Sequence, residues 1–181
     1  SRRSSHYANS GLVVSVEPAD VEKAGFKGVM GGIALQRKLE ALAFEAGGGK
    51  LVAPATRVAD FVAGKGSSTL PSTSYLPGLF ATDLAPVLDG VGLSISKRIA
   101  GALRAFDKRM RGYLTSEAIL VGVESRTSSP VRVPRDSETL ESPSLKNLYP
   151  TGEGAGYAGG IMSAAMDGMR VSREVVARVE K

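Results

Sequence analysis

The sequence predicts an α/β protein, because short apolar runs of strand length alternate with longer segments that have the period of a helix. Residues 31–46 and 95–110 show the helical period, whereas residues 118–123 form a continuous apolar run that suits a strand covered on both faces. Near the C-terminus, a glycine-rich string separates an expected strand from a third helical segment. We therefore expect a mixed set of helices and short strands that ends in a strand, a glycine-rich turn and a helix.

The N-terminal third is expected to hold a strand, a helix and one or two further short strands. Residues 12–16 are rich in β-branched side chains and stop before a proline, which predicts a strand. Apolar residues recur every three or four positions in residues 31–46, and the three glycines that follow end this helix. Residues 51–62 contain several valines interrupted by Pro54, which favours short strands over a helix.

The middle of the chain combines a loop with two further helices. Residues 64–78 are rich in Ser, Thr and Pro, which predicts a flexible loop. Asp83 is placed to cap a short helix that ends near residue 88. The helix at residues 95–110 carries Lys and Arg opposite its apolar face. Because aromatic side chains for base stacking are missing from that basic face, a solvated helix is favoured over nucleic-acid binding.

The C-terminal part is expected to run from a polar segment into a strand and a helix. Residues 124–143 are polar and interrupted by prolines, and a short strand is expected at residues 145–150. The last helix is predicted over residues 157–179. Small and apolar residues surround most of its first half, which is therefore expected to be buried.

The composition excludes several kinds of site. The 181 residues include no cysteine and one histidine, His6, so a disulfide scaffold, a thiol nucleophile and a Cys- or His-cluster metal site are excluded.

No apolar run reaches about 18 residues, so no membrane-spanning helix is expected. The net charge of +5 would help an acidic partner to approach without identifying one. Without a secretory signal pattern, a soluble protein of a reducing compartment, the cytoplasm or an organelle stroma, is expected.

The glycine-rich string places five glycines among the nine residues 152–160. Glycines gather where side chains would block a close approach, and free N–H groups at a helix start favour electronegative ligand atoms. The spacing does not fit a P-loop, and an acidic residue would repel phosphate, so Glu153 is expected to accept a hydrogen bond from a sugar or polyol hydroxyl. The alternative is a glycine-rich turn with a helix cap and no ligand.

Several segments in order resemble a known family. Residues 9–16, 35–40, 54–61, 122–132 and 149–160 together resemble the C-terminal half of uncharacterised FAD-dependent dehydrogenases related to the HI0933-like flavoproteins. The resemblance implies that the last strand and helix complete a Rossmann-like FAD-binding domain, and that an inserted substrate-side domain covers the flavin. It assigns the cofactor contacts to ten consecutive residues: Gly152, Glu153, Gly154, Ala155, Gly156, Tyr157, Ala158, Gly159, Gly160 and Ile161.

The resemblance also implies what the chain lacks. The G-x-G-x-x-G that would hold the FAD pyrophosphate is absent, and the chain does not begin with Met, so an upstream half of the same flavoprotein is the expected partner. The implied domains are residues 1–117, on the substrate side, and residues 118–181, in the FAD-binding domain. The alternative is a non-catalytic interaction module that keeps a flavoprotein fold.

A polar loop after the expected strand at residues 118–123 is the candidate for the substrate side. Arginines and hydroxyls at this position could bind an unidentified anionic small molecule or orient the flavin, and a solvated polar loop is the equal alternative. The residues concerned are Arg126, Thr127, Ser128, Ser129 and Arg132.

Overall fold

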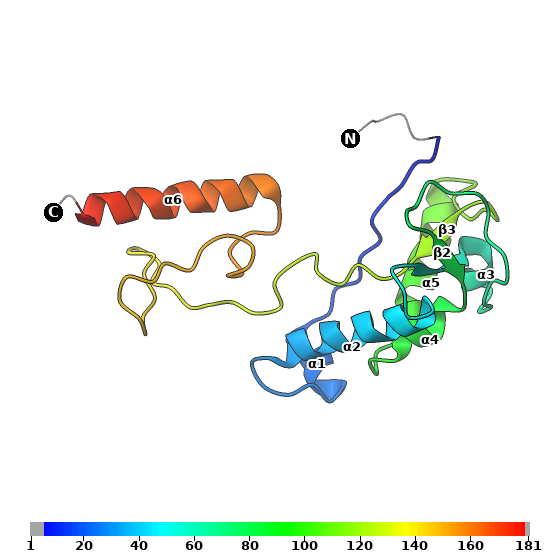
Figure 1. Ribbon diagram of the computed structural model, residues 1–181, viewed down its shortest axis with the longest axis horizontal. Coiled ribbons are helices and arrows are strands. Elements are labelled where there is room, and N and C mark those ends of the chain that lie inside the picture. Colours follow the sequence, from blue (N-terminus) through cyan, green and yellow to red (C-terminus); the bar gives the residue numbers. More distant parts are fainter. Residues whose placement is uncertain (1–5, 180–181) are drawn as a thin grey trace. The chain divides into compact units, whose positions relative to one another are not determined.

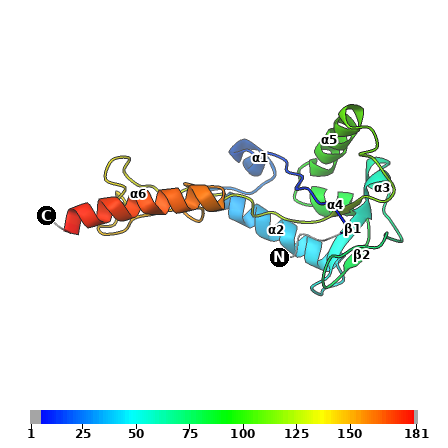
Figure 2. The same cartoon turned by 90° about the horizontal axis from the view of Figure 1, so that it is seen from above.

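The protein is described by a computed structural model in which residues 6–179 are placed (Figures 1 and 2). The chain divides into two compact units, Ser1–Ser125 and Arg126–Lys181. The first unit is a mixed α and β structure with a small three-stranded sheet. Its elements in chain order are α1 (Pro18–Lys23), α2 (Gly31–Ala46), β1 (Ala53–Arg57), α3 (Val58–Val62), β2 (Leu79–Ala81), α4 (Leu84–Asp89), α5 (Ile95–Arg109) and β3 (Ile119–Val121).

The sheet has the order β2-β1-β3, so the first strand in sequence lies in the centre. β1 pairs with β2 in parallel, with Ala55 opposite Ala81, and with β3 antiparallel, with Ala55 opposite Val121. The buried hydroxyl of Thr56 links the central strand to the next helix. It donates to the carbonyl of Thr82 at 2.7 Å and accepts from the amide of Leu84 at 3.1 Å. This buried hydroxyl therefore has both a hydrogen-bond donor and an acceptor as partners inside the core.

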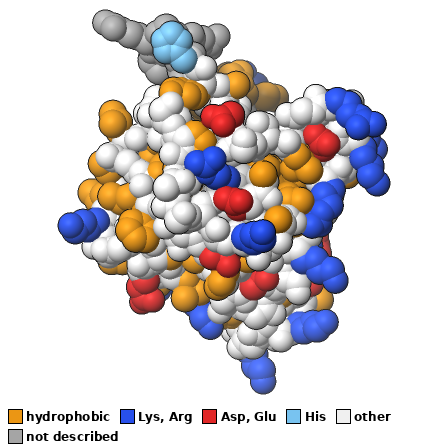
Figure 3. Space-filling model, turned by 90° about the vertical axis from the view of Figure 1, so that its right-hand side faces the viewer, with side chains coloured by type: hydrophobic (Ala, Val, Ile, Leu, Met, Phe, Trp, Pro, Cys, Tyr) orange, Lys and Arg blue, Asp and Glu red, His pale blue; other side chains and the backbone are white. Residues whose placement is uncertain are grey.

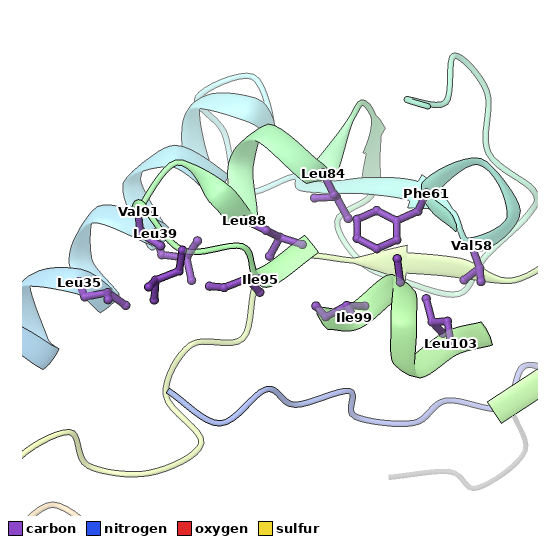
Figure 4. Close-up of a cluster of buried hydrophobic side chains, with 12 residues drawn as sticks. Leu35, Leu39, Val58, Phe61, Leu84, Leu88, Val91, Ile95, Ile99 and Leu103 are labelled. Carbon is purple, nitrogen blue, oxygen red and sulfur yellow. The ribbon is translucent and has the colours of Figure 1, made fainter. Parts of the chain in front are cut away.

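One hydrophobic core holds the first unit together, and Figure 4 shows its side chains pointing toward one another from α2, α3, α4 and α5. Leu84 and Leu103 are almost completely buried within it. α5 has a clear apolar face, which is why the period read from the sequence gives the observed helix. The buried members of the core are Leu35, Leu39, Val58, Phe61, Leu84, Leu88, Val91, Leu93, Ile95, Ile99, Ala100 and Leu103.

Three predicted helices are confirmed in this unit. α2 ends at Ala46, and the left-handed conformations that follow fall on Gly48 and Gly49, with φ of 84° and 70°. Asp83 caps α4, since its carboxylate accepts a hydrogen bond from the amide of Ala85 at 3.0 Å. Residues 64–78 contain no helix or strand, as predicted for a loop. Ser67 nevertheless anchors this loop, because its hydroxyl donates to Asp60 at 2.6 Å.

Two strand predictions in the first unit need correction. Residues 12–16 form no strand, although Leu12, Val14 and Val16 pack partly buried against the core, so their alternation reflects an extended segment without a pairing partner. The prediction for residues 51–62 is half right, since β1 is followed directly by the short helix α3.

The apolar run at residues 118–123 is also not the strand that was expected. β3 is an edge strand of three residues, and Val121 is 38% exposed. A run covered on both faces is therefore wrong for this segment. An apolar run can also form an antiparallel edge strand, because one face of such a strand packs on the core.

The second unit consists of irregular chain and one helix, α6 (Ile161–Val179). Residues 145–150 form no strand, which corrects the expected strand before the glycines. The helix starts four residues later than predicted. Its first half is not buried as expected, because Ile161 is 90% exposed and Met162 is 72% exposed in this structure.

Lys and Arg side chains lie at the surface of the first unit, and two of them on α5 make contacts within it. On the face drawn in Figure 3, Lys and Arg side chains are scattered, with many of them toward the right-hand side, and Asp, Glu and apolar side chains lie between them. Two arginines of α5 are engaged within the unit, Arg98 with Asp20 at 3.4 Å and Arg104 with the carbonyl of Val62. Among residues 6–179, no helix is both long enough and apolar enough to cross a membrane.

Candidate functional site

The glycine-rich loop, residues 150–160, is a series of turns that leads into α6. Gly152 and Gly156 have φ of 72° and 84°, a conformation that side chains with a Cβ rarely adopt. The turns are closed by two main-chain hydrogen bonds, from the amide of Gly156 to Glu153 at 2.9 Å and from Tyr157 to Gly152 at 3.0 Å. The loop is therefore a defined structure even though no strand precedes it.

The inner side of this loop touches residues 131–133 through main-chain atoms. A Cβ at Gly156 would lie 2.6 Å from the carbonyl oxygen of Val131, a distance at which the chain would have to move. The amide of Val133 donates to the carbonyl of Ala155 at 3.1 Å. Gly156 is thus required by a close approach within the protein itself.

The outer side of the loop is bare. A Cβ at Gly152 or Gly154 would have no heavy atom within 4 Å, and one at Gly159 would meet only the Ser128 hydroxyl, at 3.8 Å. Within residues 6–179, the amides of Gly154 and Gly159 donate to no protein acceptor. A ligand can therefore approach the main chain here without meeting a side chain.

The remaining residues assigned to the cofactor differ in their surroundings. The side chain of Glu153 is exposed, so its carboxylate is open to a hydroxyl ligand. Ala155 and Ala158 are half-buried, Gly160 directly precedes α6, and the Ile161 side chain is exposed at the first residue of that helix. Glu153 and Ile161 are therefore the members of this set with exposed side chains.

A buried ion pair lies at the base of the loop. The Arg135 guanidinium contacts both carboxylate oxygens of Asp167 on α6, at 2.6 and 2.9 Å, and the two side chains are only 5% and 11% exposed. Asp167 also accepts from the amide of Gly152 and the hydroxyl of Thr151, each at 2.9 Å. The hydrogen bond from Arg135 is the main reason that the pKa of the Asp167 carboxyl lies well below its usual range.

Tyr157 packs within the second unit. Its ring lies under the Arg135 guanidinium, whose carbon is 3.6 Å from the ring centroid, and Arg132 is 4.8 Å away. The phenol hydroxyl donates to the carbonyl of Val133 at 2.9 Å. The ring and hydroxyl of Tyr157 are thus both engaged inside the protein.

The candidate substrate loop, residues 126–132, lies against the glycine-rich loop. The Ser129 hydroxyl donates to the carbonyl of Val131 at 2.8 Å and also lies 3.3 Å from the carbonyl oxygen of Gly154. The guanidinium of Arg132 donates to the carbonyl of Gly156 at 3.1 Å. Ser128 is exposed and faces the Gly159 position, and Arg126 and Thr127 are exposed as well. Two segments that the sequence analysis treated separately are therefore neighbours.

The sequence analysis missed Arg135 and Asp167. The available signal was Asp167 itself, a lone carboxylate among the Met and Ala residues of the first half of α6. An acid on an apolar helix implies a basic partner. Nothing in the sequence separated Arg135 from its neighbouring arginines. His6 is exposed.

The comparisons with known proteins concern both units. Residues 1–127 match the family described as FAD-dependent protein, C-terminal domain-like, so the match ends close to the boundary between the units. Over 177 residues, 96% of this chain, the sequence is 42% identical to an uncharacterised protein of Clostridium beijerinckii. The chain spans 32% of the length of that relative. Because the family match covers more than half of its residues, the chain belongs to the FAD-dependent protein, C-terminal domain-like family.

Proposed function

We propose that this chain forms part of an FAD-dependent oxidoreductase and that the outer side of the glycine-rich loop lies against FAD. The observation that carries the proposal is the bare main chain at Gly152, Gly154 and Gly159, on a chain of an FAD-dependent family. FAD supplies the redox chemistry in such proteins, and the protein positions it.

The residues of the loop have distinct roles in this proposal. The exposed carboxylate of Glu153 accepts a hydrogen bond from a ribityl hydroxyl, and the amides near Ala158 to Ile161 donate to the flavin. Ser128 and Arg132 adjoin the loop and orient an anionic small-molecule substrate or the flavin itself. Arg126, Thr127 and Ser129 belong to the same substrate-side loop.

The two parts of the chain have different roles in the proposed flavoprotein. Residues 118–181, of which residues 119–121 pair with β1 in the sheet of the first unit, contribute to a Rossmann-like FAD-binding domain of the HI0933-like type, and residues 1–117 form the substrate-side insert. An upstream half supplies the pyrophosphate-binding turn that these residues lack. Support for a larger assembly comes from α6, where the apolar side chains of Ile161, Met162 and Met166 are exposed.

The test introduces a bulky side chain at a loop position where the protein has room for it but a bound FAD would leave none. In the full-length protein that carries these residues, Gly154→Leu points into open space and should fold normally while weakening FAD binding by about tenfold or more. Gly101→Leu on α5 is the matched control, because a Cβ there also meets open space. Titration with FAD, followed by flavin fluorescence, measures both variants.

Two outcomes would contradict this proposal. If Gly154→Leu binds FAD as tightly as the wild type, the loop is not the cofactor site. A full-length protein that takes up no FAD at all would instead favour a second candidate, a non-catalytic interaction module, which the exposed apolar face of α6 also supports.

A further inference from the structure

We propose that Arg135 and Asp167 are a positioning pair that sets the shape of the glycine-rich loop for FAD binding. This inference rests on the proposed function. It assigns to two residues outside the loop the task of holding the loop's main chain in a form that a ligand can approach.

Asp167 holds the beginning of the loop. Its carboxylate accepts from the Thr151 hydroxyl and the Gly152 amide, both at 2.9 Å. Asp167 lies in the second turn of α6, so these bonds fix the entry of the loop to the helix that follows it. A carboxylate can make these contacts and bind a guanidinium at the same time because it has several acceptor positions.

Arg135 contacts both ends of the loop. It donates to the carbonyl of Pro150 at 2.8 Å, directly before the glycines, and stacks on the ring of Tyr157 near the end. It also makes the two bonds to Asp167. One planar guanidinium therefore connects the loop entry, the loop exit and α6, a task for which its fixed fork of donors is suited.

The Arg135–Asp167 pair differs from the ion pairs that Arg178 makes in the second unit. Arg178 contacts Glu141 at 2.6 Å and Glu174 at 3.3 Å, and its side chain is 31% exposed. Those contacts join α6 to residue 141 without touching residues 150–160. The Arg135–Asp167 pair is more buried, and its hydrogen bonds go to the loop itself. If the Arg135–Asp167 pair only stabilised the fold, breaking either this pair or the Arg178–Glu141 pair would change FAD binding to the same extent.

The experiment compares Asp167→Asn with Glu141→Gln in the full-length protein. Each substitution replaces one carboxylate of an ion pair that also accepts a main-chain N–H, from Gly152 in one case and Asn147 in the other. Both variants should lose thermal stability. Only Asp167→Asn should weaken FAD binding, by about tenfold, and change the visible circular dichroism of the flavin at saturating FAD.

Arg135→Lys keeps the charge next to Asp167 but cannot donate two parallel bonds or lie flat on Tyr157. It should fold and still weaken FAD binding several-fold, so the proposal can be tested even if Asp167→Asn fails to fold. Wild-type FAD affinity in Arg135→Lys would overturn the pair's role, and so would an equal loss of affinity in Glu141→Gln. Wild-type affinity in Gly154→Leu would overturn the proposed function instead.

Discussion

Gly156 lies where the glycine-rich loop and residues 131–132 meet through their main chains. Alanine at this position combines a left-handed φ of 84° with a Cβ 2.6 Å from the Val131 carbonyl oxygen. We expect Gly156→Ala to reduce the free energy of unfolding by about 1–3 kcal/mol. Chemical denaturation measures this change.

Gly154→Ala is the matched control, because it lies two residues away and its Cβ would meet no atom within 4 Å. Its effect on unfolding should stay within about 0.5 kcal/mol. Equal losses in the two variants would show that the close approach at Gly156 does not constrain the loop.

Asp167 makes stability depend on pH at the acidic end. The Arg135 hydrogen bond holds the folded pKa of Asp167 below its unfolded value of about 3.9. A depressed carboxyl pKa adds stability that is fully present above the unfolded pKa and is lost as the pH falls toward the folded pKa. The stability difference between the wild type and Asp167→Asn should therefore be constant near neutral pH and shrink below about pH 4. Denaturation curves between pH 7 and 2 measure it, and a constant difference throughout would contradict the assigned cause.

At the scale of elements, the sequence predicts the long helices well. α2 and α5 each repeat apolar residues every three or four positions, and both bury that face against the same core. Asp83 predicts the start of α4 because a cap is a local interaction between a side chain and the next few amides. Local period and local capping need no knowledge of distant residues.

The strands and α6 show where local patterns stop being informative. Residues 12–16 are rich in β-branched side chains but find no pairing partner among the described residues, and β3 lies at an edge although its sequence suits a buried strand. Strand formation depends on partners far away in the chain. The apolar first half of α6 predicts burial, yet Met162 and Met166 are exposed. An apolar face signals that something should cover it without placing that cover within the same chain.

The candidate site was predictable only in part. The concentration of glycines identified the loop, and its bare outer side agrees with the reason for which glycines gather. The packing of residues 126–132 against that loop and the pairing of Arg135 with Asp167 could not be read from the sequence. Both depend on the path of an irregular segment, for which the sequence has no periodic signal.

At the scale of the whole molecule, the family match and the core coincide. The match covers residues 1–127, and every buried member of the main hydrophobic core lies between residues 35 and 103. The sheet is also completed by residue 121. The first unit thus has the features of an independently folding domain, and its size is sufficient for a stable core.

We therefore expect residues 1–127 to fold on their own with a single cooperative thermal transition, measured by circular dichroism. The reason is that the packing of Leu103, which is 1% exposed, involves only residues of this unit. Leu103→Ala should lower the free energy of unfolding by about 2–5 kcal/mol in residues 1–127 and by the same amount in residues 1–181. Leu51→Ala, at a position that is 85% exposed, is the control and should have little effect in either. A broad transition in residues 1–127, or a Leu103→Ala loss that appears only in the longer chain, would mean that residues after 127 complete the core.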